Sequence, residues 1–291
     1  MTKGSPPNLP YFAGIDIGST MTKAVVIDAA GNIISAVKGP TGAEHRHLAN
    51  EVMAKALEAA GLRLEEVGWI VATGYGRFNV PFADEHITEL SCHARGVYQL
   101  FPNARTVVDI GGQDAKCLKV REGKLVDFAM NDKCAAGTGR FLELTAQSLG
   151  IGLEDLAALS LRASKPVEVS NMCTIFAQQE VVLRLSQGER IEDIIAGLHR
   201  ALAERVAALV RRLGIEPEVV LTGGVAKNAG MVQAMKEALG CSLLVPEEPL
   251  LTGALGAALL AMERTQRLLA QGKPLKTKAR HLEKATFYTG S

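Results

Sequence analysis

The sequence predicts an α/β protein built from two copies of one βββαβ unit, because one motif occurs twice at matching places. The segment Asp16-Ile17-Gly18-x4-Lys23 recurs as Asp109-Ile110-Gly111-x4-Lys116. Each copy follows an apolar run and precedes a run of alternating polar and apolar residues, the pattern of a strand, a turn and a returning strand. A lone Asp-x-Gly marks an ordinary turn, whereas a matched pair indicates an internal duplication.

The first copy reads as three strands, an amphipathic helix that stops at Gly61, and a fourth strand. Polar and apolar residues alternate along the expected strands, whereas apolar residues recur at helical spacing in the segment before Gly61. A glycine at that point favours the end of a helix. The expected strands are 11–17, 22–28, 32–38 and 69–73, and the expected helix is 44–60.

The second copy starts with the same three strands, but helices separate them from the fourth. The expected strands are 106–110, 115–120, 124–130 and 218–222, and the inserted helices are 139–149, 153–161, 174–186 and 191–213. A helix at 231–239, a strand at 242–245 and a final helix at 253–269 follow. We therefore expect an N-terminal lobe over residues 10–104, a C-terminal lobe with the insertion and the final helix over 105–271, and a solvated basic tail over 272–291.

Composition indicates a folded protein without general affinity for nucleic acid. Hydrophobic residues make up 47% of the 291 positions, which is enough to bury a core in each of two domains. The 32 basic residues nearly balance the 31 acidic ones, and aromatic residues amount to only 4%. Neither a basic footprint nor a stacking platform for single strands is therefore expected.

We expect a cytoplasmic protein without a membrane anchor. The polar, proline-rich start lacks the apolar core of a signal peptide. The longest small-apolar stretch, residues 254–262, is far shorter than the roughly 20 residues that span a bilayer. In the cytoplasm the cysteines are expected to be thiols or ligands rather than disulfides.

The two hairpins carry residue types that bind phosphate and a hydrated metal ion. Backbone N–H groups of a glycine-rich turn can hold phosphate, and a strand-end carboxylate can hold Mg²⁺ through water. The candidates are Gly18, Ser19, Thr20 and Lys23 in the first hairpin, Gly111, Gly112 and Gln113 in the second, and Asp16 and Asp109 for magnesium. Each carboxylate, taken alone, could equally cap its turn.

A Gly-Gly turn follows the last strand of the second copy. The segment Gly223-Gly224-Val225 leads from that strand toward a helix, and Asn228 comes shortly after it. Such a turn suits close backbone approach to a ligand. A packing turn is the alternative.

Taken in order, Asp16-x-Gly18-Ser19-Thr20, Asp109-x-Gly111-Gly112-Gln113 and Thr222-Gly223-Gly224-Val225 resemble the actin, sugar kinase and heat-shock chaperone ATPase superfamily. The resemblance covers nearly the whole chain. It implies an actin-like ATPase fold, in which two ribonuclease H-like lobes surround a nucleotide cleft. It also implies that ATP or ADP binds with its phosphates and magnesium between the first two motifs and its adenosine beside the third, where Val225 and Asn228 would contribute.

Two further segments are similar to the cluster-binding segments of the ATP-dependent activators of 2-hydroxyacyl-CoA dehydratases, which are related to ATPase subunits of benzoyl-CoA reductase. They are residues 131–142, with Cys134 and Gly137-Thr138-Gly139, and residues 171–177, with Cys173. The resemblance implies a homodimer that holds one 4Fe-4S cluster between its subunits and delivers a low-potential electron as ATP is hydrolysed. Ferredoxin or flavodoxin would be the donor, and a dehydratase or a double-cubane-cluster protein the acceptor.

Cys134 and Cys173 each precede a predicted helix, where the helix dipole favours a thiolate and the negative charge of a cluster. Because a 4Fe-4S cluster takes four cysteines, two subunits would supply the set from these two positions. A single cysteine is more commonly a buried packing residue. We expect that packing role for Cys92, Cys117 and Cys241.

The remaining expectations concern coupling and hydrolysis. Gly137-Thr138-Gly139 would touch the nucleotide while the neighbouring cysteine holds the cluster, and Gln113 or Glu180 would orient the attacking water. Thr88-Glu89-Leu90 together with His93-Ala94-Arg95-Gly96 also resembles a segment of the family, and the sequence assigns it no role. The main alternative function is a small-molecule kinase of the same superfamily, and a third is a non-catalytic nucleotide sensor.

Overall fold

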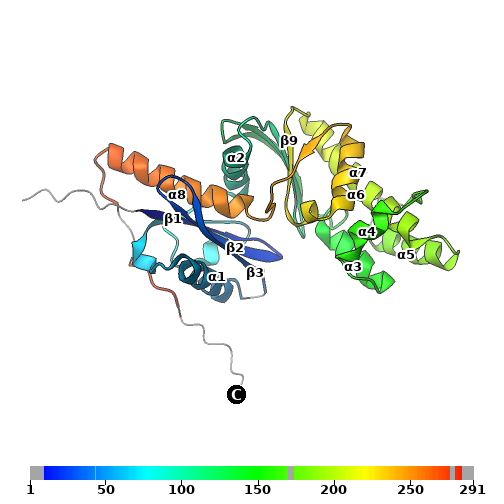
Figure 1. Ribbon diagram of the computed structural model, residues 1–291, viewed down its shortest axis with the longest axis horizontal. Helices are drawn as coiled ribbons and strands as arrows, with labels where there is room; N and C mark the ends of the chain where they lie inside the picture. The colour runs from blue at the N-terminus through cyan, green and yellow to red at the C-terminus, as the bar shows by residue number, and fades with distance from the viewer. Residues whose placement is uncertain (1–9, 43, 170–173, 276–278, 284–291) are drawn as a thin grey trace, which may run out of the picture. The chain divides into compact units, whose positions relative to one another are not determined.

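The computed structural model describes residues 10–42, 44–169, 174–275 and 279–283. The chain divides into two compact units, Met1–Leu100 with Leu251–Ser291, and Phe101–Leu250. Each unit contains one five-stranded sheet in its described residues, accompanied by helices (Figure 1). The predicted α/β class with two sheets of the same kind is confirmed. No helix within the described ranges is long and apolar enough to cross a membrane.

The sheet of the first unit has the order β3-β2-β1-β4-β5. β2 and β3 run antiparallel to their neighbours, whereas β4 runs parallel to β1. The strands are β1 (Tyr11–Ile17), β2 (Met21–Asp28), β3 (Ile33–Pro40), β4 (Val67–Thr73) and β5 (Glu85–His86). β1 and β4 are buried on both faces, so nearly every residue in them is apolar.

Helices cover the two faces of this sheet. Helix α1 (His45–Ala60) packs through one apolar cluster with alternate residues of β1, and α8 (Thr252–Ala270) packs through a second cluster on the opposite face (Figure 1). Helix α2 (Glu89–Leu100) lies against α8. Gly61 ends α1 in the left-handed conformation, as its position predicted.

The second unit repeats this plan with the order β10-β9-β6-β7-β8. β6 again pairs antiparallel with the next strand along the chain and parallel with a distant one, β9. The strands are β6 (Thr106–Ile110), β7 (Ala115–Arg121), β8 (Lys124–Asn131), β9 (Val219–Thr222) and β10 (Leu243–Leu244). The helices are α3 (Gly139–Leu149), α4 (Asp155–Leu161), α5 (Thr174–Ser186), α6 (Ile191–Leu213) and α7 (Ala229–Leu239).

The final helix packs on the first sheet, whereas the sequence placed it with the second lobe. Gly14 of β1 permits this packing, because a Cβ at this position would lie 2.1 Å from the carbonyl oxygen of Ala254 in α8. Helix and strand therefore meet at backbone contact, which only a glycine allows. Hydrophobic periodicity identified the helix but carried no information on which sheet it covers.

The described part of the C-terminal segment is anchored to the first unit, although the sequence predicted a solvated tail. Arg280 is 8% exposed in its side chain, and its Nε lies 3.3 Å from Asp84 Oδ1. Its two terminal nitrogens donate to the carbonyls of Val67 and Gly68 at 2.8 and 3.0 Å. Burial lowers the pKa of this guanidinium, and the neighbouring carboxylate opposes that shift.

We expect Arg280→Met to lower the free energy of unfolding by about 3 kcal/mol, because it leaves the Asp84 carboxylate and two carbonyls without their buried partner. Urea unfolding followed by circular dichroism measures this loss. Arg46→Met is the matched control, since Arg46 pairs with Glu283 of the same segment but is 62% exposed, and exposed pairs contribute under about 1 kcal/mol. Equal losses in the two variants would contradict the anchoring role.

His199 of α6 is a buried group that makes the second unit sensitive to acid. It is 1% exposed, and burial lowers its pKa from 6.5 to about 4. Its Nε2 lies 3.3 Å from Asn228 Nδ2, so the neutral ring accepts that hydrogen bond. The unfolded chain binds a proton near pH 6.5 and the folded chain does not. The contribution of the neutral His199 to the free energy of unfolding is therefore fully present above about pH 6.5, and it is lost as the pH decreases toward about 4.

We expect the free energy of unfolding to fall between pH 7 and pH 5 by about 2 kcal/mol through this histidine. His199→Gln removes the titrating group, so the variant will be less stable at pH 7 but will lose that part of the pH dependence. His281→Gln, at an exposed position, is the control and should keep the wild-type slope. Unfolding titrations at both pH values measure the difference, and identical slopes in wild type and His199→Gln would refute the assignment.

Candidate phosphate turns and cysteine loop

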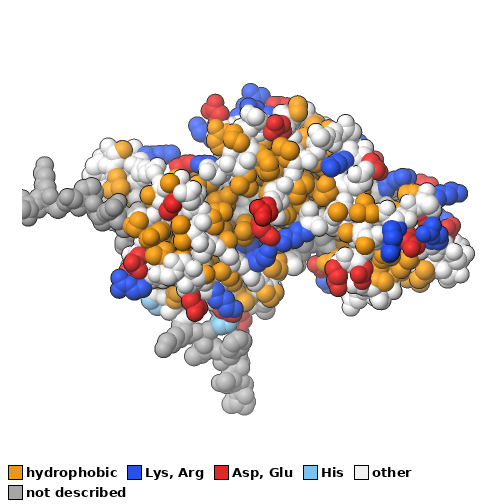
Figure 2. All heavy atoms as spheres, in the orientation of Figure 1, with side chains coloured by type: hydrophobic (Ala, Val, Ile, Leu, Met, Phe, Trp, Pro, Cys, Tyr) orange, Lys and Arg blue, Asp and Glu red, His pale blue; other side chains and the backbone are white. Residues whose placement is uncertain are grey.

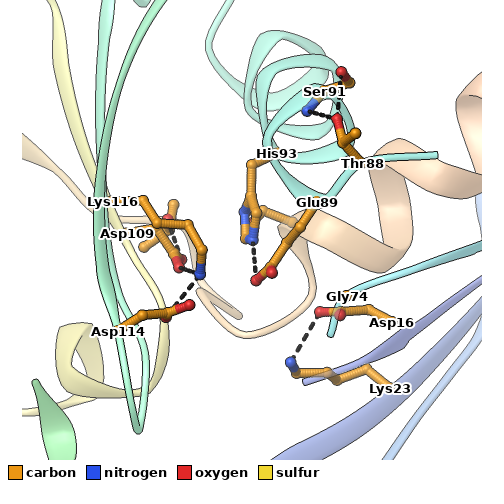
Figure 3. Close-up of polar contacts among 12 residues, drawn as sticks. Asp16, Lys23, Gly74, Thr88, Glu89, Ser91, His93, Asp109, Asp114 and Lys116 are labelled. Atoms are coloured by element: carbon orange, nitrogen blue, oxygen red, sulfur yellow. Dashed lines mark hydrogen bonds and ion pairs between the residues drawn. The ribbon is translucent and has the colours of Figure 1, made fainter. Parts of the chain in front are cut away.

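The first hairpin holds a buried ion pair at the end of β1. The strand register sets Asp16 opposite Lys23, and Lys23 Nζ lies 2.9 Å from Asp16 Oδ2 (Figure 3). Asp16 Oδ1 is buried and has no hydrogen-bond partner within the described residues. Because an unpartnered buried carboxylate oxygen is costly, this atom suits a water molecule of a hydrated Mg²⁺ ion.

The second hairpin repeats the arrangement with an additional carboxylate. Asp109 stands opposite Lys116, whose Nζ lies 3.6 Å from Asp109 Oδ2 and 2.7 Å from Asp114 Oδ1 (Figure 3). Thr222 at the end of β9 donates its hydroxyl hydrogen to Asp109 Oδ1 at 2.8 Å. The sequence identified Asp109 but not the contributions of Asp114 and Thr222.

The duplication extends to the parallel strand beside each hairpin. Thr73-Gly74 and Thr222-Gly223 end β4 and β9, and the registers set the two threonines beside Asp16 and Asp109. Both glycines have a positive φ, 85° and 86°. A Cβ on Gly74 would lie 2.3 Å from Asp16 Oδ1, and one on Gly223 would lie 2.3 Å from the carbonyl oxygen of Ile110. The sequence analysis did not identify Gly74. The signal for it was the Thr-Gly pair that follows a strand in both copies of the unit.

The start of α3 rests directly on the second phosphate turn. The backbone N–H groups of Gly139 and Arg140 donate to the carbonyls of Gly111 and Gly112, both at 2.8 Å. A Cβ on Gly139 would lie 3.1 Å from the Gly111 oxygen, so glycine permits this approach. The turn predicted to bind phosphate and the helix that follows the cysteine loop are thus joined by two backbone hydrogen bonds.

The loop that carries Cys134 is held by its own polar groups. Asn131 Nδ2 donates to the carbonyls of Cys134 and Ala136, each at 3.0 Å. Thr138 Oγ1 donates to the carbonyl of Ala135 at 2.7 Å, and Thr138 itself is buried. Cys134 is only half-buried, so its thiol can reach a ligand at the surface while its backbone stays fixed.

Two of the other described cysteines are buried, whereas Cys241 is half-buried like Cys134. Cys92 and Cys117 are buried, and burial raises the pKa of each thiol to about 12. Burial also raises the pKa of Cys241. A thiol with a raised pKa is a poor ligand and nucleophile, so packing suffices for these three. Cys173 lies outside the described residues.

The remaining residues predicted to bind nucleotide differ in their exposure to solvent. Ser19 is half-buried in the first turn, Thr20 and Gln113 are exposed, and Thr138 is buried. Val225 is buried, with its side chain close to Gly139 of the α3 start. The second unit therefore brings Val225 to the Gly111–Gly112 turn.

Two predicted residues, one at the cap of a helix and one within a helix, have structural partners. Asn228 caps α7, because its Oδ1 accepts from the Met231 N–H at 3.0 Å. Glu180 lies on α5, which packs against α3 and α6, and its carboxylate faces Arg184 at 3.5 Å. Neither contact requires a nucleotide.

Comparison with known proteins places this arrangement among ATPases. Residues 13–261 match the BadF/BadG/BcrA/BcrD ATPase family. The 2-hydroxyisocaproyl-CoA dehydratase activator of Clostridioides difficile is 45% identical over 262 residues, which cover 88% of this chain and 96% of the relative. A benzoyl-CoA reductase subunit from Thauera aromatica is 33% identical over 273 residues, with 90% and 96% covered.

Solved structures agree with these relatives. The activator of the 2-hydroxyisocaproyl-CoA dehydratase from Clostridium difficile with bound ADPNP superposes with a TM-score of 0.85 at 44% identity, covering 91% of this chain and 98% of that one. A ROK family glucokinase from Streptomyces griseus shares the fold alone, at 17% identity, a TM-score of 0.54 and coverage of 87% and 99%. The predicted actin-like ATPase fold is confirmed.

Proposed function

Because this chain belongs to the BadF/BadG/BcrA/BcrD ATPase family, we propose that it is an ATP-driven reductive activator that delivers a low-potential electron to a partner iron–sulfur enzyme. One observation carries the proposal. The two hydrogen bonds from the start of α3 to the Gly111–Gly112 turn join the expected phosphate site to the loop of Cys134. A change at the phosphates therefore acts on the cysteine loop through fixed backbone contacts.

ATP and ADP bind at the duplicated turns in this proposal. Gly18, Ser19 and Thr20 with Lys23 hold phosphate in the first unit, and Gly111, Gly112 and Gln113 do so in the second. Asp16 and Asp109 hold Mg²⁺ through water, for which the unpartnered Asp16 Oδ1 provides support. Gly137, Thr138 and Gly139 line the phosphates, and Gly223, Gly224, Val225 and Asn228 lie toward the adenosine.

Cys134 and Cys173 of two identical subunits would hold one 4Fe-4S cluster. The cluster, when bound, supplies a one-electron reductant of low potential. The half-buried Cys134 in a firmly hydrogen-bonded loop suits a ligand at a boundary between two protomers.

An apolar stripe on α5 supports the homodimer. Ile175 and Phe176, two and three residues after the predicted ligand Cys173, are each 63% exposed, and Val182 and Leu183 two turns later are 48% and 54% exposed. Hydrophobic side chains are visible on the surface where Figure 1 places α5 (Figure 2). Four large apolar side chains at helical spacing suit burial against a second copy of the same helix.

The proposed partners rest on the family resemblance of the sequence rather than on any described surface, and relatives named as dehydratase activators support the acceptor. A 2-hydroxyacyl-CoA dehydratase or a double-cubane-cluster protein would accept the electron, and ferredoxin or flavodoxin would supply it in the cytoplasm. Neither nucleic acid nor a membrane has a part in this function.

Anaerobic purification followed by absorption spectroscopy, iron analysis and sedimentation tests the proposal. We expect a broad iron–sulfur band, about four iron atoms per dimer, and electron transfer to an acceptor only with hydrolysable ATP. An iron-free protein that transfers phosphate to a small molecule would support the kinase alternative instead. Equal electron transfer without nucleotide, with ADP and with ATP would show that the two sites are not coupled.

A further inference from the structure

Helices α2 and α8 of the first unit cross at backbone contact. A Cβ on Gly96 would lie 2.0 Å from the carbonyl oxygen of Thr252, and one on Gly256 would lie 1.7 Å from that of Cys92. These distances leave no room for a side chain, so the two glycines set how closely the helices approach. The first turn of α8 is thereby fixed against α2.

His93 lies at this crossing and joins the two helices. Its side chain is 4% exposed, its Nδ1 lies 2.9 Å from Thr252 Oγ1, and its Nε2 lies 3.6 Å from the Glu89 carboxylate one turn earlier in α2 (Figure 3). When the Thr252 hydroxyl donates to Nδ1, the ring proton is on Nε2 and faces Glu89. The imidazole then fixes the orientation of this carboxylate.

The same crossing sets His93 beside the Asp16 hairpin. Gly253 follows Thr252, and a Cβ on Gly253 would lie 3.0 Å from Asp16 Oδ2 and 3.3 Å from His93 Nε2. The Asp16 carboxylate, which is proposed to hold hydrated magnesium, and the His93 imidazole therefore both lie next to the backbone of Gly253. Glu89 begins α2, its carboxylate lies 3.6 Å from the same His93 Nε2, and its side chain keeps 21% of its surface exposed.

We infer that Glu89, oriented by His93, accepts the proton of the water that attacks the terminal phosphate of ATP; this inference rests on the nucleotide site proposed above. The water oxygen bonds to the γ-phosphorus, and the bond from that phosphorus to the β,γ-bridging oxygen breaks. ADP leaves with the electron pair, and one water proton passes to the Glu89 carboxylate. The partial exposure of Glu89 allows the proton to pass on to solvent.

Glu89 suits this role better than the two residues that the sequence indicated. The amide of Gln113 can orient water but cannot accept a proton at neutral pH. Glu180 faces Arg184 on α5. Glu89, by contrast, faces a buried imidazole that fixes its orientation, the base-and-orienter arrangement typical of hydrolytic sites.

Glu89→Gln keeps the size of the side chain and removes its ability to take a proton. For the cluster-loaded homodimer we expect kcat for ATP hydrolysis to fall by about 100-fold or more, while the Kd of ATP with Mg²⁺, measured by calorimetry, changes by less than about threefold. Glu263→Gln is the matched control, because Glu263 belongs to the same helix pair and faces Arg95 Nε at 2.6 Å. It should leave both quantities unchanged.

His93 is a positioning residue, and a pair of variants separates positioning from packing. The amide of His93→Gln can still donate toward Glu89, whereas His93→Leu fills the space without a donor. We expect His93→Leu to lose about 30-fold in kcat with little change in KM, and His93→Gln to recover most of that loss. Equal losses in both variants, in proportion to their melting temperatures, would reduce His93 to a packing role.

Two results would overturn the inference and leave the proposed function standing. One is hydrolysis by Glu89→Gln at the wild-type rate. The other is an affinity for ATP that falls as far as kcat, since Glu89 would then be a binding group. A wild-type protein that neither binds ATP with Mg²⁺ nor holds iron would contradict the proposed function itself, and this inference with it.

Discussion

Cys134→Ser will give a protein that folds and binds ATP but holds no iron. The loop around Cys134 is fixed by Asn131 and Thr138 through backbone carbonyls rather than through the thiol, so the substitution leaves the loop intact. A serine hydroxyl is a poor iron ligand at neutral pH, and each dimer would lose two of its four ligands. Iron analysis should fall to near zero, and sedimentation should shift toward the monomer.

The matched control for this prediction is Cys241→Ser. Cys241 lies outside the predicted ligand set, and its thiol has a raised pKa. Cys117→Ser should also retain iron, although the buried thiol of β7 contributes to packing. Loss of iron from either control, together with its retention in Cys134→Ser, would show that the ligands have been assigned wrongly.

Hydrophobic periodicity predicted most of the fold. Helices 139–149, 174–186 and 191–213 begin and end where the sequence placed them, because each has an apolar stripe and a glycine at or near its end. The segment between β4 and β6 was left unassigned, and it contains α2. Its buried residues include Cys92, His93 and Gly96, which are not the large apolar side chains by which a buried helix face is identified in a sequence.

The candidate site was predictable only where it depends on local sequence. Asp16 and Lys23 meet across one hairpin, so their spacing reveals the contact. Thr222 reaches Asp109 through the pairing of strands more than a hundred residues apart, which no local pattern encodes. The pairing of Glu89 with His93 follows from helical spacing, but its place beside Asp16 depends on how α2 crosses α8, and that is a property of the packed unit.

Gly74→Ala is expected to remove most ATP hydrolysis although position 74 need not touch the nucleotide. A Cβ there would lie 2.3 Å from Asp16 Oδ1 and 2.5 Å from the carbonyl oxygen of Ile17. The backbone oxygen cannot move easily, so the carboxylate must shift. Because a displacement of about 1 Å at a catalytic group can cost about 100-fold in rate, we expect kcat/KM for ATP to fall by about that factor.

Gly61→Ala separates this effect from backbone strain. Gly61 also has a positive φ, 66° against 85° at Gly74, but a Cβ on it would meet no atom within 4 Å. The positive φ costs each alanine variant about 1 kcal/mol of stability through backbone strain, but only Gly74→Ala also displaces Asp16. Steady-state hydrolysis and urea unfolding of the two variants measure the rate and the stability independently. Wild-type hydrolysis by Gly74→Ala at a stability equal to that of Gly61→Ala would mean that the position of the Asp16 carboxylate does not limit the reaction.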